Sequence, residues 1–437
     1  MGKTIEDTVL LNLCSGCGVC AGVCPKDCIQ WDRKKGFYQP AVRSEDCIRC
    51  GLCRKVCPGL GHSYAELPEE AAVKGTVRFS VNAWSRDADI RFVSASGGVV
   101  TTLIRVLLGE DRYDAAFLVN SYDYRTQLQS ELVCAENFAS PAHSGYPKSR
   151  YLPVSQERAV SYIRKNPDQK VIFVGISCAV RGIVRAIEEL SLTRDNYLIL
   201  GLFCDRVFTY DVLSYFQNNA VCCGRTIDEL HFKNKESGGW PGNMKLIFSD
   251  GTCAYSDKAE RMKAKDYFMP ERCLYCVDKL NVCADISIGD NFTQRDSNAQ
   301  GSNSVLVRTK TGECAWEQAQ RDLEAHEVSA KEIMEAQSVG WRLNHYCYSR
   351  LREAEIEKET GQQVILNPGL RSGRNIRDYA DLWKQNRKRL RLGEQYNQDP
   401  ERFSEEIEED LKNKDMGKDK NPSIFRRGIR LIKRKLG

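Results

Sequence analysis

The sequence predicts an α+β protein made of a small cysteine-rich N-terminal domain, a larger α/β domain and a helical C-terminal tail. Three observations predict this order. Cysteines crowd the N-terminal part, short apolar runs then alternate with helical patterns, and the residues beyond about 350 are charged and helical in pattern. The expected boundaries are 1–62 for the first domain, 63–78 for a polar linker, 79–350 for the second domain and 351–437 for the tail.

Composition and charge exclude several classes of protein. Of 437 residues, 42% are hydrophobic and 28% are charged, which is typical of a globular chain rather than a disordered or collagen-like one. The net charge is only +5 and no basic, aromatic-interleaved stripe crosses the body, so we expect no nucleic-acid partner. No apolar run is long enough to span a membrane, and the first ten residues lack a secretory signal, which favours a cytoplasmic location.

The N-terminal cysteines form two copies of one pattern, C-x2-C-x2-C-x3-C-P. Three close cysteines wrap one face of a [4Fe–4S] cubane, and the fourth, ahead of the proline, ligates the other cluster. Structural zinc is disfavoured because zinc ribbons separate their paired cysteines by longer spacers, and large cytosolic proteins seldom carry disulfide frameworks. We therefore predict a bacterial-type 2[4Fe-4S] ferredoxin domain. Its predicted ligands are Cys14, Cys17, Cys20 and Cys57 for cluster one, and Cys47, Cys50, Cys53 and Cys24 for cluster two.

Cys28 stands outside the repeat, and we predict that it is a small buried hydrophobic residue rather than a ligand. Two adjacent cubanes with thiolate ligands transfer single electrons and do no bond chemistry themselves. The sequence therefore predicts that a site further along the chain uses these electrons.

The body of the chain alternates between predicted strands and predicted helices, which indicates an α/β layer with some parallel pairing. The strands are expected at 115–120, 171–176 and 197–203, and the helices at 98–108, 179–190 and 210–218. From about residue 227 to 257 the pattern changes, and Ser249-Asp250-Gly251 predicts a hairpin turn in an α+β appendage.

Three local patterns in the body carry chemistry. Ser96-Gly97-Gly98 opens a predicted helix, where free amide groups either bind a phosphate or are capped by the serine. Cys178 and Cys204 each follow a predicted strand, where sites assemble, although either residue is equally explained by core packing. The third pattern, Cys273-x2-Cys276, suits a redox pair, half of a zinc site or part of a cluster. Together these four cysteines are enough for a third cubane. No dinucleotide-binding or P-loop motif is present.

Taken in order, these patterns resemble the family of coenzyme F420 hydrogenase/dehydrogenase beta subunits over about residues 90–295. A fused two-cluster ferredoxin is a familiar arrangement in that family. The elements that carry the resemblance are Ser96-Gly97-Gly98, Gly175 to Cys178, Leu202-Phe203-Cys204, Phe232-Lys233-Asn234-Lys235 with Trp240, and Cys273-x2-Cys276 followed by Ala284-Asp285-Ile286-Ser287-x-Gly289-Asp290.

The resemblance implies an iron–sulfur flavoprotein oxidoreductase whose second domain binds FAD beside a third [4Fe–4S] cluster. Electrons would pass to or from a two-electron partner, which is F420, another small molecule or a redox protein, because a flavin converts between single electrons and pairs. By analogy Ser96, Gly97 and Gly98 hold the FAD phosphates. The segment Pro147-Lys148-Ser149-Arg150-Tyr151 lies along the same cofactor, and Cys178, Cys204, Cys273 and Cys276 ligate the inner cluster.

Several residues depart from the family pattern and leave the substrate open. Ser177 stands where the family usually has proline, Arg206 where it often has glycine, and Asn291-Phe292 alters the ending of the last motif. Cys283 is either an additional ligand or a residue packed beneath the sheet. We expect Asp290 and Lys235 to be surface salt-bridge partners and assign no catalytic residue.

The alternative function is a non-catalytic electron-transfer adaptor that only connects a donor to a partner enzyme. The last 17 residues, NPSIFRRGIRLIKRKLG, add a basic amphipathic helix with no acidic residue. Such a helix either makes peripheral contact with an anionic membrane surface, here the inner membrane, or lies in solvent or against a partner.

Overall fold

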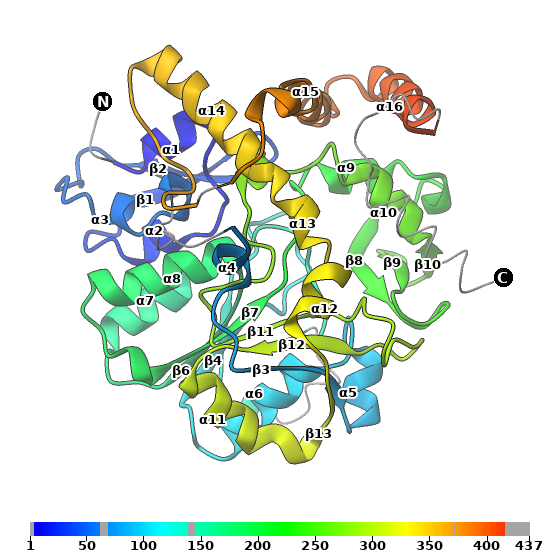
Figure 1. The fold of residues 1–437 in the computed structure, drawn as a ribbon. Coiled ribbons are helices and arrows are strands. Elements are labelled where there is room, and N and C mark those ends of the chain that lie inside the picture. Colours follow the sequence, from blue (N-terminus) through cyan, green and yellow to red (C-terminus); the bar gives the residue numbers. More distant parts are fainter. Residues whose placement is uncertain (1–3, 62–68, 139–145, 371, 416–437) are drawn as a thin grey trace.

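The computed structural model describes residues 4–61, 69–138, 146–370 and 372–415, and it is built around one mixed sheet (Figure 1). The eight strands follow the order β13-β3-β12-β11-β7-β6-β4-β5. The strands β4, β6, β7 and β11 are parallel, and the others pair antiparallel. The strands are β3 (Phe79–Ser85), β4 (Ala115–Leu118), β5 (Glu131–Val133), β6 (Val171–Ile176), β7 (Tyr197–Leu202), β11 (Ile286–Asp290), β12 (Asn303–Val307) and β13 (Leu323–Glu327).

Two hydrophobic cores lie on opposite faces of this sheet, because successive side chains of a strand point to opposite sides. Ile172, Leu198 and Leu200 pack with α6 (Val99–Gly109) and α11 (Lys310–Ala319) on one face. Phe173 and Ile199 pack with α7 (Glu157–Lys165) and α8 (Ser177–Glu189) on the other. The short helix α5 (Ala88–Val93) precedes α6.

The sequence-based strands at 115–120, 171–176 and 197–203 are confirmed as β4, β6 and β7, and the α/β layer with parallel pairing is confirmed with them. These strands could be predicted from the sequence because strands buried on both faces form near-continuous apolar runs. Strands β3 and β12 were missed because buried polar residues interrupt their pattern. The hydroxyl of Ser304 on β12 donates to the side-chain oxygen of Asn82 on β3 at 3.1 Å.

A smaller antiparallel sheet forms the appendage predicted near residues 227–257. It consists of β8 (Ile227–Asn234), β9 (Asn243–Phe248) and β10 (Cys253–Ser256), flanked by α9 (Val212–Gln217) and α10 (Lys258–Ala264). The predicted hairpin turn is confirmed between β9 and β10, where Gly251 has a φ of +81° and the Phe248 amide donates to the Thr252 carbonyl at 2.9 Å.

The N-terminal domain packs directly on helices α7 and α8 of the main domain (Figure 1). Its elements are α1 (Glu6–Leu10), α2 (Val19–Gly22), β1 (Ile29–Lys34), β2 (Phe37–Val42) and α3 (Leu52–Lys55). The Gln156 amide donates to the Cys17 carbonyl at 2.8 Å, and the Arg164 side chain donates to the Gly22 carbonyl at 3.1 Å. The first cysteine set is therefore held against the main domain by backbone contacts.

The segment expected to be a polar linker contains a helix, α4 (Glu69–Lys74). Its Val73 is buried in the same hydrophobic cluster as Leu280 and Leu306 of the main domain. The Arg308 side chain also donates to the Lys74 carbonyl at 2.7 Å. The end of this segment is therefore part of the packed structure, which the mixed polar sequence did not indicate.

The C-terminal helices lie across the N-terminal domain and the small sheet (Figure 1). They are α12 (Ala330–Ala336), α13 (Val339–Arg342), α14 (Asn344–Thr360), α15 (Ala380–Gln395) and α16 (Pro400–Asp415). Arg352 on α14 donates to the Leu11 carbonyl at 3.0 Å, and Arg389 on α15 pairs with Asp410 on α16 at 2.8 Å. The predicted basic amphipathic helix at 421–437 lies outside the described residues.

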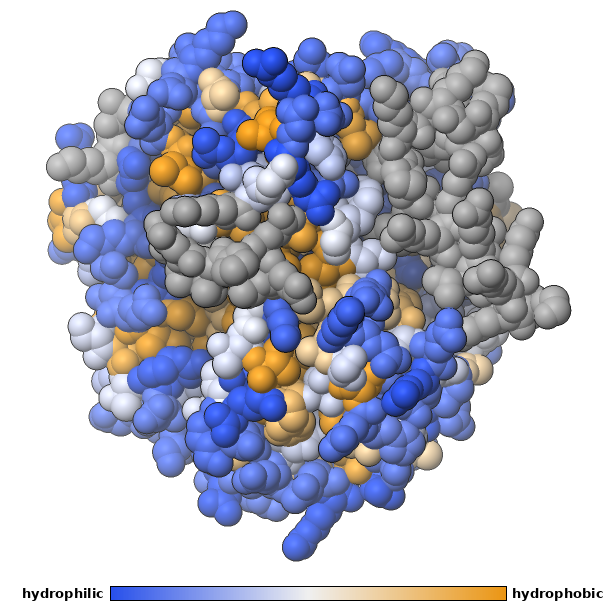
Figure 2. Space-filling model, in the orientation of Figure 1, coloured by the Kyte–Doolittle hydropathy of each residue, from blue (hydrophilic) through white to orange (hydrophobic). Residues whose placement is uncertain are grey.

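No helix within the described ranges is long and apolar enough to cross a membrane. Hydrophilic residues cover most of the face seen in Figure 2, with apolar residues exposed in patches between them.

Gly22 tests the docking of the N-terminal domain. A methyl group there would lie 2.6 Å from Cβ of Val160 and 2.7 Å from the Glu157 carbonyl, so Gly22→Ala forces α2 away from α7. We expect Gly22→Ala to lower the free energy of unfolding by about 1–3 kcal/mol.

The matched control is Gly109→Ala, where nothing lies within 4 Å. The control should be neutral or stabilising by about 0.4–1 kcal/mol. Urea unfolding of the anaerobic holoprotein measures both, and equal stabilities would contradict this packing.

Candidate electron-transfer site

The candidate site lies where the parallel strands of the main sheet end. Cys178 follows β6, Cys204 follows β7, and Asp290 closes β11. The carbonyls of Asn120 and Ser121, just after β4, accept hydrogen bonds from Arg150 at 2.8 and 2.9 Å. The carboxyl ends of parallel strands share one edge of a sheet, so the fold brings these groups to the same edge.

The cysteines predicted for cluster one come together against the main domain. Burial, and then the neighbouring thiols of Cys17, Cys57 and Cys14, raise the pKa of Cys20 well above its ordinary value. Gly18 begins the short helix that carries Cys20 and has a φ of +78°. A side chain at Gly18 would collide with Ser155, because a Cβ there would lie 2.1 Å from the serine hydroxyl oxygen.

The cysteines predicted for cluster two line a recess on the surface. The recess holds about 390 Å³ of space, including the part open to solvent, and its lining includes Cys24, Cys47, Cys50 and Cys53. Burial and then the thiols of Cys50 and Cys24 raise the pKa of Cys53 to about 11. Cys50 is exposed, so this set is the one nearest to solvent.

Cys28 is buried, as the hydrophobic interpretation required, but it also lies beside a predicted ligand. Its sulfur is 3.5 Å from the sulfur of Cys24. Cys28 is therefore a buried cysteine whose thiol lies beside the thiol of a predicted cluster ligand.

The four cysteines of the third set also converge. Cys178 lies in the first turn of α8, Cys204 follows β7, and Cys273 and Cys276 belong to the loop around a 3-10 turn at Glu271–Tyr275. Burial, and then the thiols of Cys178, Cys273 and Cys276, raise the pKa of Cys204 well above its ordinary value.

The first and third sets are neighbours. Among the groups that raise the pKa of Cys178, the thiol of Cys17 comes directly after burial, and Cys178 in turn raises the pKa of Cys14. Cys53 joins the second set to the first in the same way, because its thiol also raises the pKa of Cys20. The three sets thus form a series from the surface recess to the edge of the main sheet.

The chemistry of these donors fits iron–sulfur clusters. The twelve cysteines are free thiols in the structure. Within the described residues, no three His, Cys, Asp or Glu side chains converge closely enough to hold a single metal ion. A cubane has four irons, each of which takes one thiolate, so its ligands surround the cluster rather than meet at one point. Buried thiols with raised pKa values ionise when a metal centre compensates their charge.

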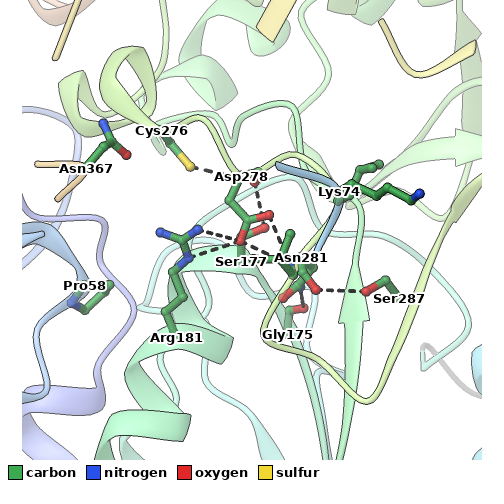
Figure 3. Close-up of polar contacts among 12 residues, drawn as sticks. Pro58, Lys74, Gly175, Ser177, Arg181, Cys276, Asp278, Asn281, Ser287 and Asn367 are labelled. Carbon is green, nitrogen blue, oxygen red and sulfur yellow. Dashed lines mark hydrogen bonds and ion pairs between the residues drawn. The ribbon is translucent and has the colours of Figure 1, made fainter. Parts of the chain in front are cut away.

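A buried polar network holds the inner cysteine loop in place (Figure 3). Arg181 on α8 pairs with Asp278 at 3.0 Å, and both side chains are almost fully buried. The Ser177 hydroxyl donates to the Asp278 carbonyl at 2.9 Å, and the Asn281 amide group donates to the Gly175 carbonyl at 2.9 Å. Ser177, a departure from the family pattern, therefore ties the start of α8 to the loop that carries Cys276.

Helix α8 also connects the inner set to cluster one. Arg185, one turn beyond Arg181, donates to the Cys57 carbonyl at 2.8 Å and to the Gly61 carbonyl at 2.6 Å. Cys178, Arg181 and Arg185 are spaced so that they lie on one side of the helix. Helix α8 therefore contacts predicted ligands from two cysteine sets.

The C-terminal segment contributes residues that the sequence did not identify. The ring Nδ1 of His345 lies 3.1 Å from the Cys273 carbonyl, and the Asn367 amide group donates to the Tyr275 carbonyl at 3.2 Å. Arg342 donates to the Asp205 carbonyl at 2.6 Å. Isolated polar residues on helices give no sequence signal of such contacts, because their partners are more than 70 residues away.

Burial raises the pKa of Cys283, and the charge of Arg181 opposes this shift. It packs against the hydrophobic cluster beneath the sheet that includes Ile183 and Tyr197. This placement agrees with the packing interpretation of Cys283.

The residues predicted for the FAD phosphates sit at the start of α6. Gly98 has a φ of +85° and precedes the helix, and the Val99 amide donates to the side-chain oxygen of Asn303 at 3.3 Å. The Ser96 hydroxyl donates to the Ser302 carbonyl at 2.7 Å. Gly97 lies so close to Asn303 that a Cβ there would be 2.7 Å from the asparagine oxygen. The Ser96 hydroxyl and the Val99 amide are thus both engaged within the protein.

Lys235 is not a surface salt-bridge partner, which corrects the expectation from sequence. It is buried, and its amino group donates to the carbonyls of Arg91 and Ser96 at 2.5 and 2.6 Å. Burial, and then the charges of Lys148 and Arg91, lower its pKa to about 7. The sequence pattern could not distinguish an exposed lysine just after β8 from one that turns toward the start of α6.

Asp290 does form an ion pair, with Lys233, but this pair is also not on the surface. The Lys233 side chain is only 7% exposed and lies 5.9 Å from the ring centre of Tyr151. Asp290 additionally accepts from the indole N–H of Trp240 at 3.5 Å.

The segment 147–151 joins the same region. Burial lowers the pKa of Lys148 to about 8, and Glu236 opposes this effect. Arg150 stacks over the ring of Tyr122 at 3.8 Å, and Arg261 lies 5.4 Å from the ring centre of Tyr151. Ser149 is half-buried. Lys148 and Lys233 thus lie near enough to Lys235 to lower its pKa, and Lys235 itself reaches the start of α6. We call these three lysines the cationic cluster, and its charge suits an anionic ligand.

Phe203 links the inner cysteines to the residues around the cationic cluster. It precedes Cys204, its amide donates to the Ile288 carbonyl at 2.8 Å, and its ring lies directly on Gly289. A Cβ at Gly289 would be 2.1 Å from that ring. Phe203 therefore precedes Cys204 in the chain and packs on Gly289, the neighbour of the Asp290 that pairs with Lys233.

Comparisons with known proteins agree with this arrangement. Residues 13–59 match the 4Fe-4S dicluster domain. Residues 80–137 and 168–332 match the N-terminal and C-terminal parts of the coenzyme F420 hydrogenase/dehydrogenase beta subunit.

The coenzyme F420-dependent sulfite reductase of Methanocaldococcus jannaschii is 23% identical over 71% of this chain. The alignment covers 46% of that relative, so the chain spans less than half of its length. One subunit of the F420H2 dehydrogenase of Methanosarcina mazei is 24% identical over 85% of this chain and 99% of its own length. A chain of the F420-reducing [NiFe] hydrogenase complex of Methanosarcina barkeri aligns with a TM-score of 0.49 and 20% identity, over 70% of this chain and 99% of that one.

The fold and the cysteine sets define an iron–sulfur redox protein with a dicluster domain fused to a larger α/β domain. The chain belongs to the family of coenzyme F420 hydrogenase/dehydrogenase beta subunits, as the resemblance of its motifs predicted.

Proposed function

We propose that this protein is an iron–sulfur flavoprotein oxidoreductase that passes electrons between three [4Fe–4S] clusters and a two-electron partner through FAD. The observation that carries the proposal is the series of cysteine sets that leads from the surface recess to the edge of the main sheet. The proposed ligands are Cys47, Cys50, Cys53 and Cys24 at the surface, Cys14, Cys17, Cys20 and Cys57 in the middle, and Cys178, Cys204, Cys273 and Cys276 at the inner site.

The cationic cluster and the loop before α6 support FAD, because their charges and backbone amides suit a diphosphate. The backbone amides of Gly97 and Gly98, with Lys148 and Lys235, would hold the phosphates, and Ser96 holds the loop in place through its bond to the Ser302 carbonyl. Tyr151 and Arg150 would line the same cofactor. When bound, FAD supplies the exchange between single electrons and an electron pair.

The remaining residues orient the site and exclude water. Lys233 fixes Asp290 at the end of β11, and the ring of Phe203 fills the space between Gly289 and Cys204. In this proposal, electrons pass between the inner cluster and FAD through this packed region. No residue there has to take up or release a proton.

F420 is a candidate partner because the names of both relatives include it. The adaptor function remains the second candidate, and the observation that favours it is that one relative is a subunit of a larger dehydrogenase. In that case the clusters would deliver electrons to another chain, and the cationic cluster would bind no flavin.

Anaerobic purification followed by iron, sulfide and flavin quantification tests this proposal. We expect about twelve irons, four per cubane, with about one FAD per chain. About eight irons and no flavin, even after FAD is added, would reject the flavoprotein and leave the adaptor.

The affinity for FAD should depend on pH through Lys235. Its pKa is lowered to about 7 by burial and by Lys148, Arg91 and Lys233, while Asp290 opposes the shift. Lys235 therefore loses its charge as the pH rises, and the dissociation constant for FAD should increase between about pH 6 and 9. Lys235→Met should bind FAD more weakly at low pH and show a flatter profile, whereas the exposed control Lys331→Met should match the wild type. Fluorescence titration measures this, and an unchanged profile in Lys235→Met would contradict the assignment.

A further inference from the structure

A group of buried positive charges surrounds the inner cysteine set. Asp205, the residue after Cys204, is approached by four cations from separate parts of the chain. Arg206 lies 3.2 Å from its carboxylate, Arg342 3.7 Å and Lys279 4.0 Å, and Lys265 forms a closer pair.

These cations outnumber the acidic groups that they contact. Arg206 also pairs with Asp266 at 2.6 Å, so two carboxylates face four cations. Arg206 and Arg342 are the most buried of the four, with side chains 9% and 3% exposed. The surplus of positive charge therefore lies in a region of low dielectric, where its field is weakly screened.

The two arginines are close enough to act on the inner cysteines. The charges of Arg342 and Arg206 both favour the ionised form of Cys273, and Arg342 does so for Cys204. The Nε–H of Arg342 is buried and has no hydrogen-bond acceptor among the described residues. A sulfur atom of the inner cluster is able to accept the hydrogen bond that this N–H does not make within the described residues.

We propose that Arg342 and Arg206 hold the reduction potential of the inner cluster above the potentials of the two outer clusters, so that electrons collect at the inner cluster before they reach the flavin. This inference rests on the proposed function, since it requires the inner cluster. Reduction adds one negative charge to a cluster, and a fixed buried cation stabilises that charge.

This charge surplus is a property of this chain rather than of its family motifs. Arg206 is one of the departures from the family pattern, and Arg342 lies beyond residue 332, where the family match ends. The segment around α13 and α14 thus both covers the inner loop, through His345, and supplies a cation to it.

The test is a redox titration of the anaerobic holoprotein, read by electron paramagnetic resonance. Arg342→Gln should make reduction of the inner cluster at least tenfold less favourable, a shift of about 59 mV to lower potential for one electron, without moving the outer clusters. Arg342→Lys should retain most of the wild-type potential because it keeps the charge. Arg125→Gln, at an 84% exposed arginine, should shift nothing.

Iron content is measured first for each variant. If Arg342→Gln retains less iron than the wild type, Arg206→Gln takes its place with the same expected shift. An inner potential unchanged in a variant with three cluster signals would overturn this proposal and leave the proposed function intact. Absence of the third signal from the wild type would overturn both.

Discussion

Replacing Cys204 by alanine is expected to remove the inner cluster and to disconnect the outer clusters from the flavin. Cys204 is buried beside Cys178, Cys273 and Cys276, so its loss leaves three thiols around a four-iron cubane. The iron content should fall from about twelve to about eight per chain. Reduction of the flavin through the outer clusters should be lost, since no other cysteine set lies between them.

The matched control is Cys222→Ala. Cys222 is more fully buried than Cys204 but belongs to none of the three sets, and its thiol donates to the Phe216 carbonyl at 3.4 Å. It should keep the full iron content and flavin reduction. If Cys204→Ala keeps about twelve irons and wild-type flavin reduction, the inner cluster is wrongly placed.

The second large effect is expected for Asp278→Ala. This substitution leaves the buried guanidinium of Arg181 without its carboxylate, which typically costs about 3–5 kcal/mol of stability. It also removes the acceptor that holds the amide of Val282. We expect lower resistance to urea and loss of the inner cluster, because Asp278 follows the loop that carries Cys276.

Two controls separate charge burial from general damage. Glu313→Ala breaks solvent-exposed pairs with Arg78 and Lys310 and should cost little stability, because water screens such pairs. The double variant Arg181→Met with Asp278→Leu removes both charges and should recover much of the lost stability. If Asp278→Ala is as stable as Glu313→Ala, the pair does not hold the inner loop.

Much of the fold could be predicted because the informative elements carry local signals. The apolar runs of β6 and β7 and the turn at Ser249-Asp250-Gly251 needed no knowledge of distant partners. Strand β3 could not be predicted, because Asn82 is buried only through its bonds to residues more than 200 positions away.

Some residues of the candidate site could likewise be predicted from the sequence, and others could not. The cysteine repeat has a fixed spacing that the chemistry of cubanes requires, so it is visible in the sequence. Lys235 was placed wrongly because its burial depends on Ser96, which reaches it only through the fold. Arg342 and His345 were missed because a single residue on a helix has no spacing that indicates a function.

The central claim is that electrons travel from the surface recess through the middle and inner clusters to the flavin. The most direct test mixes the holoprotein with limiting dithionite and follows the clusters and the flavin by rapid freezing, electron paramagnetic resonance and absorption. Cys50 is exposed, whereas Cys178 and Cys204 are half-buried, so we expect an outer cluster signal to form first and then to decay as the flavin is reduced. Flavin reduction that precedes the cluster signals, or that persists unchanged in Cys204→Ala, would contradict the account.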